Sequence, residues 1–404
     1  MLRLYYLRIK IINSWVHLSK KHNLKMIKCQ KHLFNLDDDE YYLNCAYKSP
    51  LLKKGELLAI NAIKKERTPS YLKPNNYFEI SEEIRKEFSK IIKSKKDEVA
   101  IMPSSSYGFA NIFNNINSNG NKAIVVENEF PSGYFSVKKW CSKNNIQLEV
   151  VERDKLSAKE WNKKIINSID SNTSLVLISS IHWMNGTKFD LKEIGEKCKA
   201  NGTYFIVDGT QSVGAMSMDV KDFKIDALIC AGYKWLFGPY SMALGYFSSK
   251  FSDGIPIEES WMNRTNAQDF SNLTEYDSKY KPMAGRYNVG ETTNFILSPI
   301  MLNGLNQINS WGINNIESYC KKLSDIVINE LSPLGIAFEN ENYFTSHLFS
   351  LGLPDHLNLL SFKNILEEKK IRVSVRGTNL RVSINVFNDE KDINKLVETV
   401  KEFI

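Results

Sequence analysis

Seven short runs rich in β-branched and other apolar residues recur between residues 98 and 248, and amphipathic stretches separate most of them. A strand followed repeatedly by a helix is the pattern of a mainly parallel sheet that is covered on both faces. We therefore expect an α/β fold built on a seven-stranded, mainly parallel sheet. The runs are EVAIMP at 98–103, AIVVEN at 123–128, LEVVE at 148–152, SLVLISSIH at 174–182, TYFIVD at 203–208, DALICA at 226–231 and MALGYFS at 242–248.

The alternation of strand-like and helical segments ends at about residue 295. Helical patterns at 297–313 and 317–332 precede strand-like runs and a last helix at 389–403, which predicts a smaller C-terminal α+β domain. The predicted organisation has four parts. These are an N-terminal extension at 1–25, an arm at 26–70 that contributes to the small domain and the active site, a large domain at 71–294 and the small domain at 295–404.

Composition excludes several classes of protein. The net charge of +7 is spread through Lys-rich helical stretches such as IRKEFSKIIKSKKDE, which indicates solvated faces and no nucleic-acid site. The six cysteines are scattered without a CxxC pattern, which favours a reduced, cytoplasmic protein and predicts no metal site.

Residues 1–25 are basic and apolar and contain no acidic residue. Arg3, Arg8 and Lys10 interrupt the apolar run, so it is too short and too charged to span a bilayer. We expect a weakly ordered extension there, with the first domain beginning near Met26. No other segment is long and apolar enough to predict a membrane span.

Polar residues of three kinds follow the predicted strands. Asp208 comes directly after TYFIV, Lys234 follows DALICAGY, and Ser104, Ser105 and Ser106 open a helix after EVAIMP. Ligand sites in open parallel sheets lie at the carboxyl ends of the strands, where these side chains meet. An amine, a carboxylate and a helix N-terminus match what pyridoxal phosphate requires of a protein: a partner for its aldehyde, one for its ring nitrogen and one for its phosphate.

The segment VDGTQSVGAMSMDVKDFKIDALICAGYKWLFGP at 207–239 resembles the cofactor-binding core of the class V aminotransferase family, also called cysteine desulfurase-like or isopenicillin-N-epimerase-like. The family pattern is Asp-Gly-x-Gln followed by (His/Tyr)-Lys-x-x-x-Gly-Pro, and both halves are present at 208–211 and 233–239. The likeness extends from about residue 38 to the end. It implies a fold-type I enzyme that depends on pyridoxal 5'-phosphate, with Lys234 as the Schiff-base lysine.

The resemblance also implies how the cofactor is held. Asp208 matches the residue that pairs with the pyridine nitrogen, and Gln211 matches the one that hydrogen-bonds the 3'-hydroxyl. Phe130 takes the place of the residue that stacks on the ring. Ser105, Ser106 and Tyr233 match the positions that bind the phosphate.

Two further positions carry implications for substrate and assembly. Arg376, in VSVRGTN, aligns with the arginine that grips a substrate carboxylate, a role for which Arg372 and Arg381 compete. Thr292 or Thr293 lies where the neighbouring subunit lends a phosphate ligand, which implies a homodimer with shared active sites.

The sequence departs from the family at several points. Trp183 replaces the usual Asn near the cofactor oxygen, or that Asn is displaced to Asn185. Ala231 stands where a Ser or Thr helps to bind phosphate elsewhere. His182 is expected to be a satisfied histidine beside the sheet and not a catalytic base.

An absent cysteine narrows the reaction. Cysteine desulfurases attack the substrate sulfur with a loop cysteine near the substrate-binding arginine, and no cysteine follows Cys320 here. Desulfuration is therefore disfavoured. The first hypothesis is an aminotransferase acting on an amino acid. A lyase or an epimerase is the alternative, and a degenerate, non-enzymatic scaffold ranks last.

Overall fold

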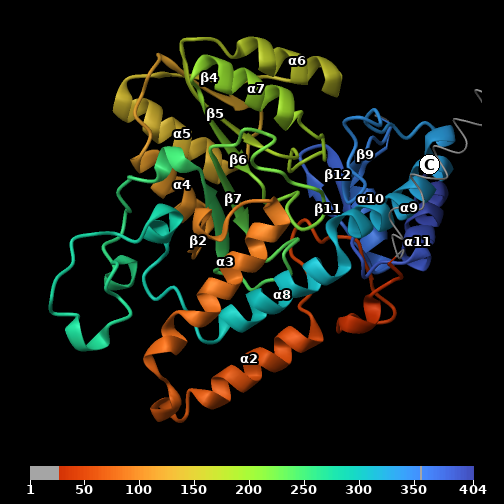
Figure 1. Cartoon of the computed structure of the whole chain (residues 1–404). Coiled ribbons are helices and arrows are strands. Elements are labelled where there is room, and N and C mark those ends of the chain that lie inside the picture. The colour runs from red at the N-terminus through yellow and green to blue at the C-terminus, as the bar shows by residue number, and fades with distance from the viewer. Residues whose placement is uncertain (1–26, 355–356) are drawn as a thin grey trace, which may run out of the picture.

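The computed structural model describes residues 27–354 and 357–404 (Figure 1). The extension expected at residues 1–25 lies outside the described residues. A seven-stranded sheet with the order β2-β8-β7-β6-β5-β3-β4 forms the centre of the larger part of the molecule. β8 runs antiparallel to both of its neighbours, and β3 to β7 are parallel, so the predicted mainly parallel sheet is confirmed. Its strands are β2 (Val99–Met102), β3 (Lys122–Val126), β4 (Gln147–Val151), β5 (Thr173–Ser179), β6 (Tyr204–Asp208), β7 (Ala227–Ala231) and β8 (Ala243–Phe247).

Helices cover both faces of this sheet. α4 (Ser105–Asn114) and α5 (Pro131–Asn144) pack on one face, and α6 (Ala158–Ser168) and α7 (Leu191–Asn201) pack on the other. Alternate residues of a strand point to opposite faces. In β3, Ala123 and Val125 belong to the core beneath α5, whereas Ile124 and Val126 belong to the core on the opposite side. Both faces are buried, which explains why the strands read as nearly continuous apolar runs.

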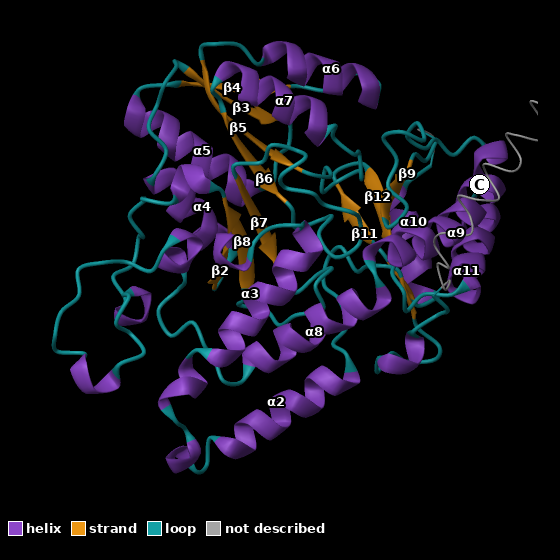
Figure 2. Cartoon of the chain, in the orientation of Figure 1, coloured by secondary structure: helices purple, strands orange, loops and turns teal. Residues whose placement is uncertain are grey.

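Three further helices lie together below the sheet in Figure 2. α8 (Leu297–Trp311) packs against both α2 (Lys53–Lys65) and α3 (Glu79–Ile92). Between β8 and α8 the chain runs through a long excursion with short 3-10 turns, including η6 (Trp261–Asn263) and η8 (Met283–Tyr287). No helix among residues 27–354 and 357–404 has the length and apolar composition that a bilayer span requires.

The C-terminal part is a smaller α+β unit, as predicted. An antiparallel sheet of order β11-β12-β9 packs with the helices at the blue end of Figure 1. β10 pairs in parallel with β1, so the N-terminal arm runs beside this unit. The domain boundaries stay a prediction. The elements are β1 (Tyr41–Tyr42), α9 (Ile313–Leu331), β9 (Leu348–Leu351), α10 (Leu359–Glu368), β10 (Ile371–Arg372), β11 (Ser374–Arg376), β12 (Asn379–Ser383) and α11 (Glu390–Phe403).

The parallel strands bring distant polar residues to one edge. Ser179 at the end of β5 is in register with Asp208 at the end of β6, and Asp208 is in register with Ile229 of β7. The loop after β7 therefore begins beside Asp208. This loop carries Lys234.

Candidate active site

The Lys234 loop closes on itself. The Gly232 N–H donates to the Met242 carbonyl and the Gly238 N–H donates to the Gly232 carbonyl, each at an N–O distance of 2.9 Å. A Cβ added to Gly232 would lie 2.8 Å from the Met242 oxygen, and one added to Gly238 would lie 2.9 Å from the Gly232 oxygen. Only glycine allows these close approaches of backbone. The turn after the lysine thus holds its side chain against the edge of the sheet.

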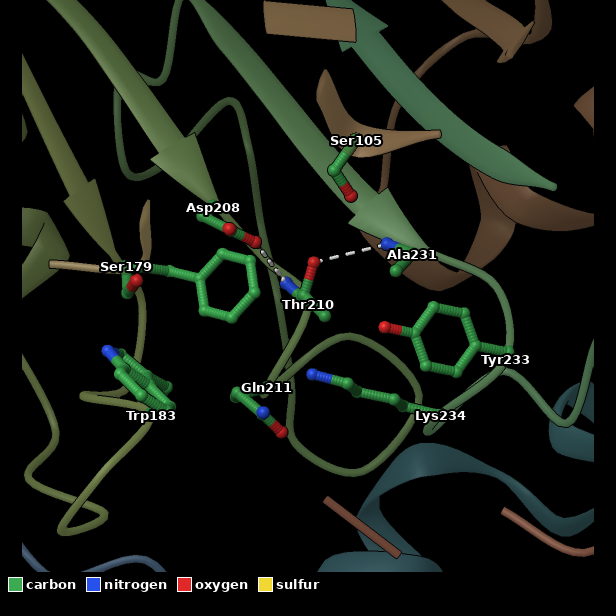
Figure 3. Close-up of a pocket in the computed structure, with 10 residues that line it drawn as sticks. Ser105, Ser179, Trp183, Asp208, Thr210, Gln211, Ala231, Tyr233 and Lys234 are labelled. Atoms are coloured by element: carbon green, nitrogen blue, oxygen red, sulfur yellow. Dashed lines mark hydrogen bonds between the residues drawn. The ribbon is translucent and has the colours of Figure 1, made fainter. Parts of the chain in front are cut away.

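Lys234 presents a buried amine (Figure 3). The residue is only 6% exposed, and its Nζ lies 5.7 Å from the ring centroid of Phe130 and 5.7 Å from that of Tyr233. Burial lowers the pKa of the Lys234 amine to about 8, although the negative charge of Asp208 acts in the opposite direction. A sizeable fraction of the amine is therefore neutral and nucleophilic near physiological pH.

Asp208 is a buried carboxyl group beside this amine. Its Oδ1 accepts a hydrogen bond from the Thr210 N–H at 2.9 Å, and Thr210 Oγ1 accepts one from the Ala231 N–H at 3.1 Å (Figure 3). Burial raises the pKa of Asp208, whereas the hydrogen bonds from Thr210 and the charge of Lys234 lower it. A cationic group placed against this carboxylate would compensate for its lost hydration.

Gln211 is oriented by its neighbours. Its Nε2 donates to the Ala46 carbonyl at 3.2 Å, and its Oε1 accepts from Trp235 Nε1–H at 2.9 Å. An indole N–H can only donate, so the amide oxygen must face Trp235. The Nε2 amide group then keeps one hydrogen for a further acceptor on the cavity side.

Phe130 is held in place by a buried acid next to it. The Glu129 carboxylate accepts hydrogen bonds from the Phe130 N–H and the Ser179 N–H, both at 2.7 Å, and from the Ser179 hydroxyl. The rings of Phe130 and Trp183 meet edge to face at a centroid distance of 5.5 Å. Two aromatic side chains thus stand opposite the lysine loop.

These side chains surround two adjoining cavities, which we call the inner and the outer compartment. The outer compartment has a volume of about 460 Å³, within the range of small-molecule sites. Four residues line both: Phe130, Trp183, Tyr233 and Lys234. The inner compartment adds Ser105, Ser179, Asp208, Thr210, Gln211 and Ala231, and the outer compartment adds Ala46, Tyr47, Lys48, Tyr240, Arg376 and Arg381.

Arg381 is the arginine that the structure buries in the outer compartment. It is 2% exposed, and its Nη1 donates to the Trp183 carbonyl at 2.7 Å. Its Nε and Nη2 are buried and have no hydrogen-bond partner among the described residues. Burial and the nearby charge of Arg376 lower the pKa of Arg381 to about 9. A buried guanidinium with free donors is a strong sign of an anion site.

The other two candidate arginines differ. Arg376 is half-buried and lines the outer compartment, and its Nη1 donates to the Val375 carbonyl at 2.8 Å. Arg372 pairs with Glu40 at 2.7 Å and lines neither compartment. The geometry therefore keeps Arg376 and Arg381 and removes Arg372.

Two of the predicted cofactor residues lie outside both compartments. Ser106 is exposed, and its hydroxyl lies 3.0 Å from that of Ser104, the N-cap of α4. Thr292 is buried, and its hydroxyl donates to the Val289 carbonyl at 2.5 Å. Ser105 faces the inner compartment instead.

His182 and Asn185 pair with each other. His182 Nδ1 lies 3.0 Å from Asn185 Oδ1, and its Nε2 lies 3.2 Å from the Glu127 carbonyl. The histidine is thus satisfied, as expected. Because Asn185 is turned toward it, Trp183 occupies the cavity wall at which the family's Asn was sought.

Sequence reasoning gave no role to Thr210, Ser179, Tyr240, Ala46 or Lys48, and it considered Tyr47 only as a second acid or base for epimerisation. Thr210 lies inside the DGTQ motif, so its place beside Asp208 had a signal. Segment 46–48 and Tyr240 reach the cavity only through packing of distant parts of the chain, and no local pattern marks them.

Comparison with known proteins identifies the family. Residues 73–396 match the family model described as Aminotransferase class-V. The chain belongs to this family. It is similar to a probable cysteine desulfurase of Pyrococcus abyssi, with 25% identity over 80% of this chain and 83% of that protein. It is also similar to an uncharacterised aminotransferase of Bacillus subtilis, with 27% identity over 80% and 83% of the two chains.

The fold agrees with a solved relative. A variant of the enzyme C-DES, which has glycine covalently linked to its pyridoxal phosphate cofactor, matches this chain with a TM-score of 0.83 and 16% identity. The match covers 93% of this chain and all of that one. The fold of this class V member is thus that of pyridoxal phosphate enzymes of fold type I.

The side chains that line the inner compartment match the groups that pyridoxal 5'-phosphate, the cofactor of this family, requires, and they enclose a cavity of about 40 Å³. It offers a buried amine for the aldehyde and a desolvated carboxylate for a protonated ring nitrogen. The Gln211 amide has a donor hydrogen to spare, and Ser105 stands at the N-terminus of α4, where backbone N–H groups favour a phosphate. Phe130 supplies an aromatic face.

Proposed function

We propose that this protein is a pyridoxal phosphate-dependent aminotransferase that acts on an amino acid. The observation that carries the proposal is the buried Lys234 amine, whose pKa is lowered to about 8 and which shares one compartment with Asp208 in a class V chain. When bound, the cofactor supplies an electron sink that stabilises negative charge at the carbon bearing the amino group.

Lys234 has two tasks in this proposal. Its neutral amine bonds to the aldehyde and so retains the cofactor. With the cofactor bound and the Lys234 amine free, that amine would remove the proton from the substrate Cα and deliver it to the cofactor, the proton movement that transamination requires. A lysine with a pKa near 8 is suited to both directions of this transfer, because neither of its protonation states dominates.

The remaining inner residues hold the cofactor in the proposal. Asp208 keeps the ring nitrogen protonated, Gln211 donates to the ring hydroxyl and Phe130 covers a ring face. Ser105 and the α4 N-terminus bind the phosphate, with Tyr233 at the shared wall. Ser106 reaches the phosphate only if its side chain turns away from Ser104, so we assign it a smaller contribution to phosphate binding than Ser105.

In the outer compartment, Arg381 binds the substrate carboxylate. Its Nε and Nη2 lie on the same edge of the guanidinium and are the two buried donors without a described partner. That edge can bind a carboxylate with two parallel hydrogen bonds. Arg376, the arginine favoured by the sequence, lines the same compartment and assists.

We propose a homodimer with shared sites, located in the cytoplasm. The support is the family resemblance, in which a residue at the position of Thr292 or Thr293 contacts the phosphate of the neighbouring subunit. All six cysteines are free thiols, as expected of a reducing compartment.

Cysteine desulfuration is disfavoured by the same site. None of the six cysteines lines either compartment. Cys45 is a buried cysteine near Lys234, and burial raises its pKa to about 12, away from the thiolate that sulfur transfer needs.

The test is a product analysis with single amino acids. Purified protein loaded with pyridoxal phosphate is mixed with each amino acid in turn, and absorbance, 2-oxo acid, ammonia and the chirality of the amino acid are followed. Equal amounts of 2-oxo acid and pyridoxamine phosphate support the aminotransferase. Release of ammonia without pyridoxamine phosphate assigns a lyase, and loss of chirality alone assigns an epimerase. A loaded protein that changes no amino acid overturns the proposal.

A further inference from the structure

We infer that the outer compartment selects amino acids whose side chain carries a second anionic group, as in aspartate and glutamate. This inference rests on the proposed function, because it names the substrate class of the same site. It is carried by the charges that line the cavity and by the way in which each arginine is held.

Every charged residue that lines the outer compartment is basic. Its lining includes Lys48, Lys234, Arg376 and Arg381, and no acidic residue is among the described residues that line it. Lys234 is reserved for the cofactor aldehyde, and one carboxylate neutralises one guanidinium. A monoanionic amino acid therefore leaves one of the two arginines without a counter-charge, whereas a dianionic one balances both; Lys48 is exposed and can be solvated by water.

Arg381 has room for one carboxylate. Trp183 occupies its Nη1 through a hydrogen bond of 2.7 Å, and its Nε and Nη2 form the single edge left for a ligand. The side chain is fully buried, so it cannot swing out to water. It is consequently a fixed receptor for a single carboxylate.

Arg376 is a second, separate receptor. It is the last residue of β11, directly before the turn to β12, which carries Arg381, so both guanidiniums reach one cavity from adjacent strands. Within the described residues its guanidinium makes one hydrogen bond, to the Val375 carbonyl, and forms no ion pair. The two positive charges repel each other: burial is the main cause of the lowered pKa of Arg381, and the charge of Arg376 lowers it further. A ligand with two anionic groups removes that repulsion.

The arginines are not placed for the cofactor phosphate. Ser105 and Thr210 line the inner compartment, and neither arginine does. The arginines share the outer compartment with Tyr47 and Tyr240, which are 60% and 65% exposed, so this compartment reaches the solvent.

Isosteric substrate pairs test the inference. Aspartate and asparagine have nearly the same shape and differ in side-chain charge, as do glutamate and glutamine. We expect kcat/KM to be at least about tenfold higher for the acid of a pair, the effect of one partly desolvated charge pair. In Arg376→Gln the ratio of acid to amide should fall toward one. Arg372→Gln is the matched control, because that arginine pairs with Glu40 outside the cavity, and it should keep the wild-type ratio.

A binding measurement separates the inference from the reaction. Succinate and butyrate have no amino group, so their calorimetric affinity for the loaded protein does not depend on turnover. Succinate should bind at least about tenfold more tightly, and Arg376→Gln should remove the difference.

Equal values for acid and amide, or for succinate and butyrate, overturn the inference and leave the proposed function standing. A preference that survives in Arg376→Gln also overturns it. If succinate is preferred but no amino acid reacts, the charge selection holds and the proposed function is what has failed.

Discussion

The inner and outer compartments touch each other, yet the chain builds them in different ways. The inner one is assembled mainly from the ends of β5, β6 and β7, which are neighbours in one sheet, and from the N-terminus of α4, which packs on that sheet. The outer one combines residues 46–48, Trp183, Tyr240 and the β11–β12 hairpin, which lie far apart in sequence. Pairing between neighbouring parallel strands holds the first, whereas the second depends on contacts between distant segments, such as the hydrogen bond from the Ser49 N–H to the Tyr233 carbonyl and that from Arg381 to the Trp183 carbonyl. Changes in the inner compartment should therefore affect the cofactor and turnover, and changes in the outer one should affect substrate selection.

The largest effect should come from Lys234→Ala. Without the amine, the cofactor has no covalent attachment and the proton transfer has no base, so turnover should fall by about 10⁴-fold or more. Reduction with borohydride followed by peptide mass spectrometry checks this directly. Lys48→Ala is the control, because it removes the other lysine of the cavity. Retention of the covalently fixed cofactor in Lys234→Ala would show that another lysine holds it.

Asp208→Asn should have the next largest effect. The amide keeps the shape of the side chain but cannot hold a positive charge on the ring nitrogen, so kcat should fall about 10²–10³-fold, as it does when one preorganised electrostatic partner is lost. Steady-state kinetics at saturating cofactor measure this drop, and equilibrium dialysis measures the weaker cofactor binding. A kcat within a factor of two of wild type would mean that a different group protonates the ring.

Arg381→Gln moves the test to the outer compartment. The amide can still donate to the Trp183 carbonyl, but it loses the guanidinium edge, so KM should rise about 10–100-fold for every amino acid, whether or not its side chain is charged. Cofactor affinity and covalent attachment should not change. A fall in cofactor affinity with an unchanged KM would place Arg381 at the inner compartment. It would contradict the assignment of cofactor binding to the inner compartment and substrate selection to the outer one.

The smallest effect is a pH dependence. Because burial lowers the pKa of Lys234 to about 8, its neutral fraction rises with pH and levels off above pH 8. The rate at which cofactor-free protein binds pyridoxal phosphate covalently should therefore increase about tenfold from pH 7 to pH 9. Asp208→Asn should shift the midpoint downward, since the Asp208 charge raises the pKa of the amine. Stopped-flow absorbance gives both curves. An upward shift in Asp208→Asn would contradict the proposed coupling.

Much of the inner compartment could be predicted from the sequence. Strands read as apolar runs, and Asp208 and Lys234 follow two of them directly, so parallel packing alone brings them together. Ser105 and Ser106 show where this reasoning ends. Successive residues of a helix point about 100° apart, so only one of the pair can face the cavity, and its identity depends on how α4 sits on the sheet.

The choice among the arginines could not be read in the same way. β12 is buried on both faces after its first residue, so alternation of polar and apolar residues gives no sign of which way Arg381 points. An arginine in such a buried strand has no explanation in the sequence pattern. The cavity beside the strand supplies the explanation. Trp183 is similar, because its place depends on contacts with distant segments: the hairpin, the Asn128 carbonyl and the Phe130 ring.

The sequence by itself determined the α/β class, the seven strands, the family and the pair of Asp208 and Lys234. Each of these depends on local periodicity or on a short motif at a strand end. The tertiary structure alone decided the position of Arg381, the paired aromatic rings of Phe130 and Trp183, and the basic outer compartment. These features are contacts between segments that no short-range pattern connects, and burial and free hydrogen-bond donors become visible only when those segments are packed together.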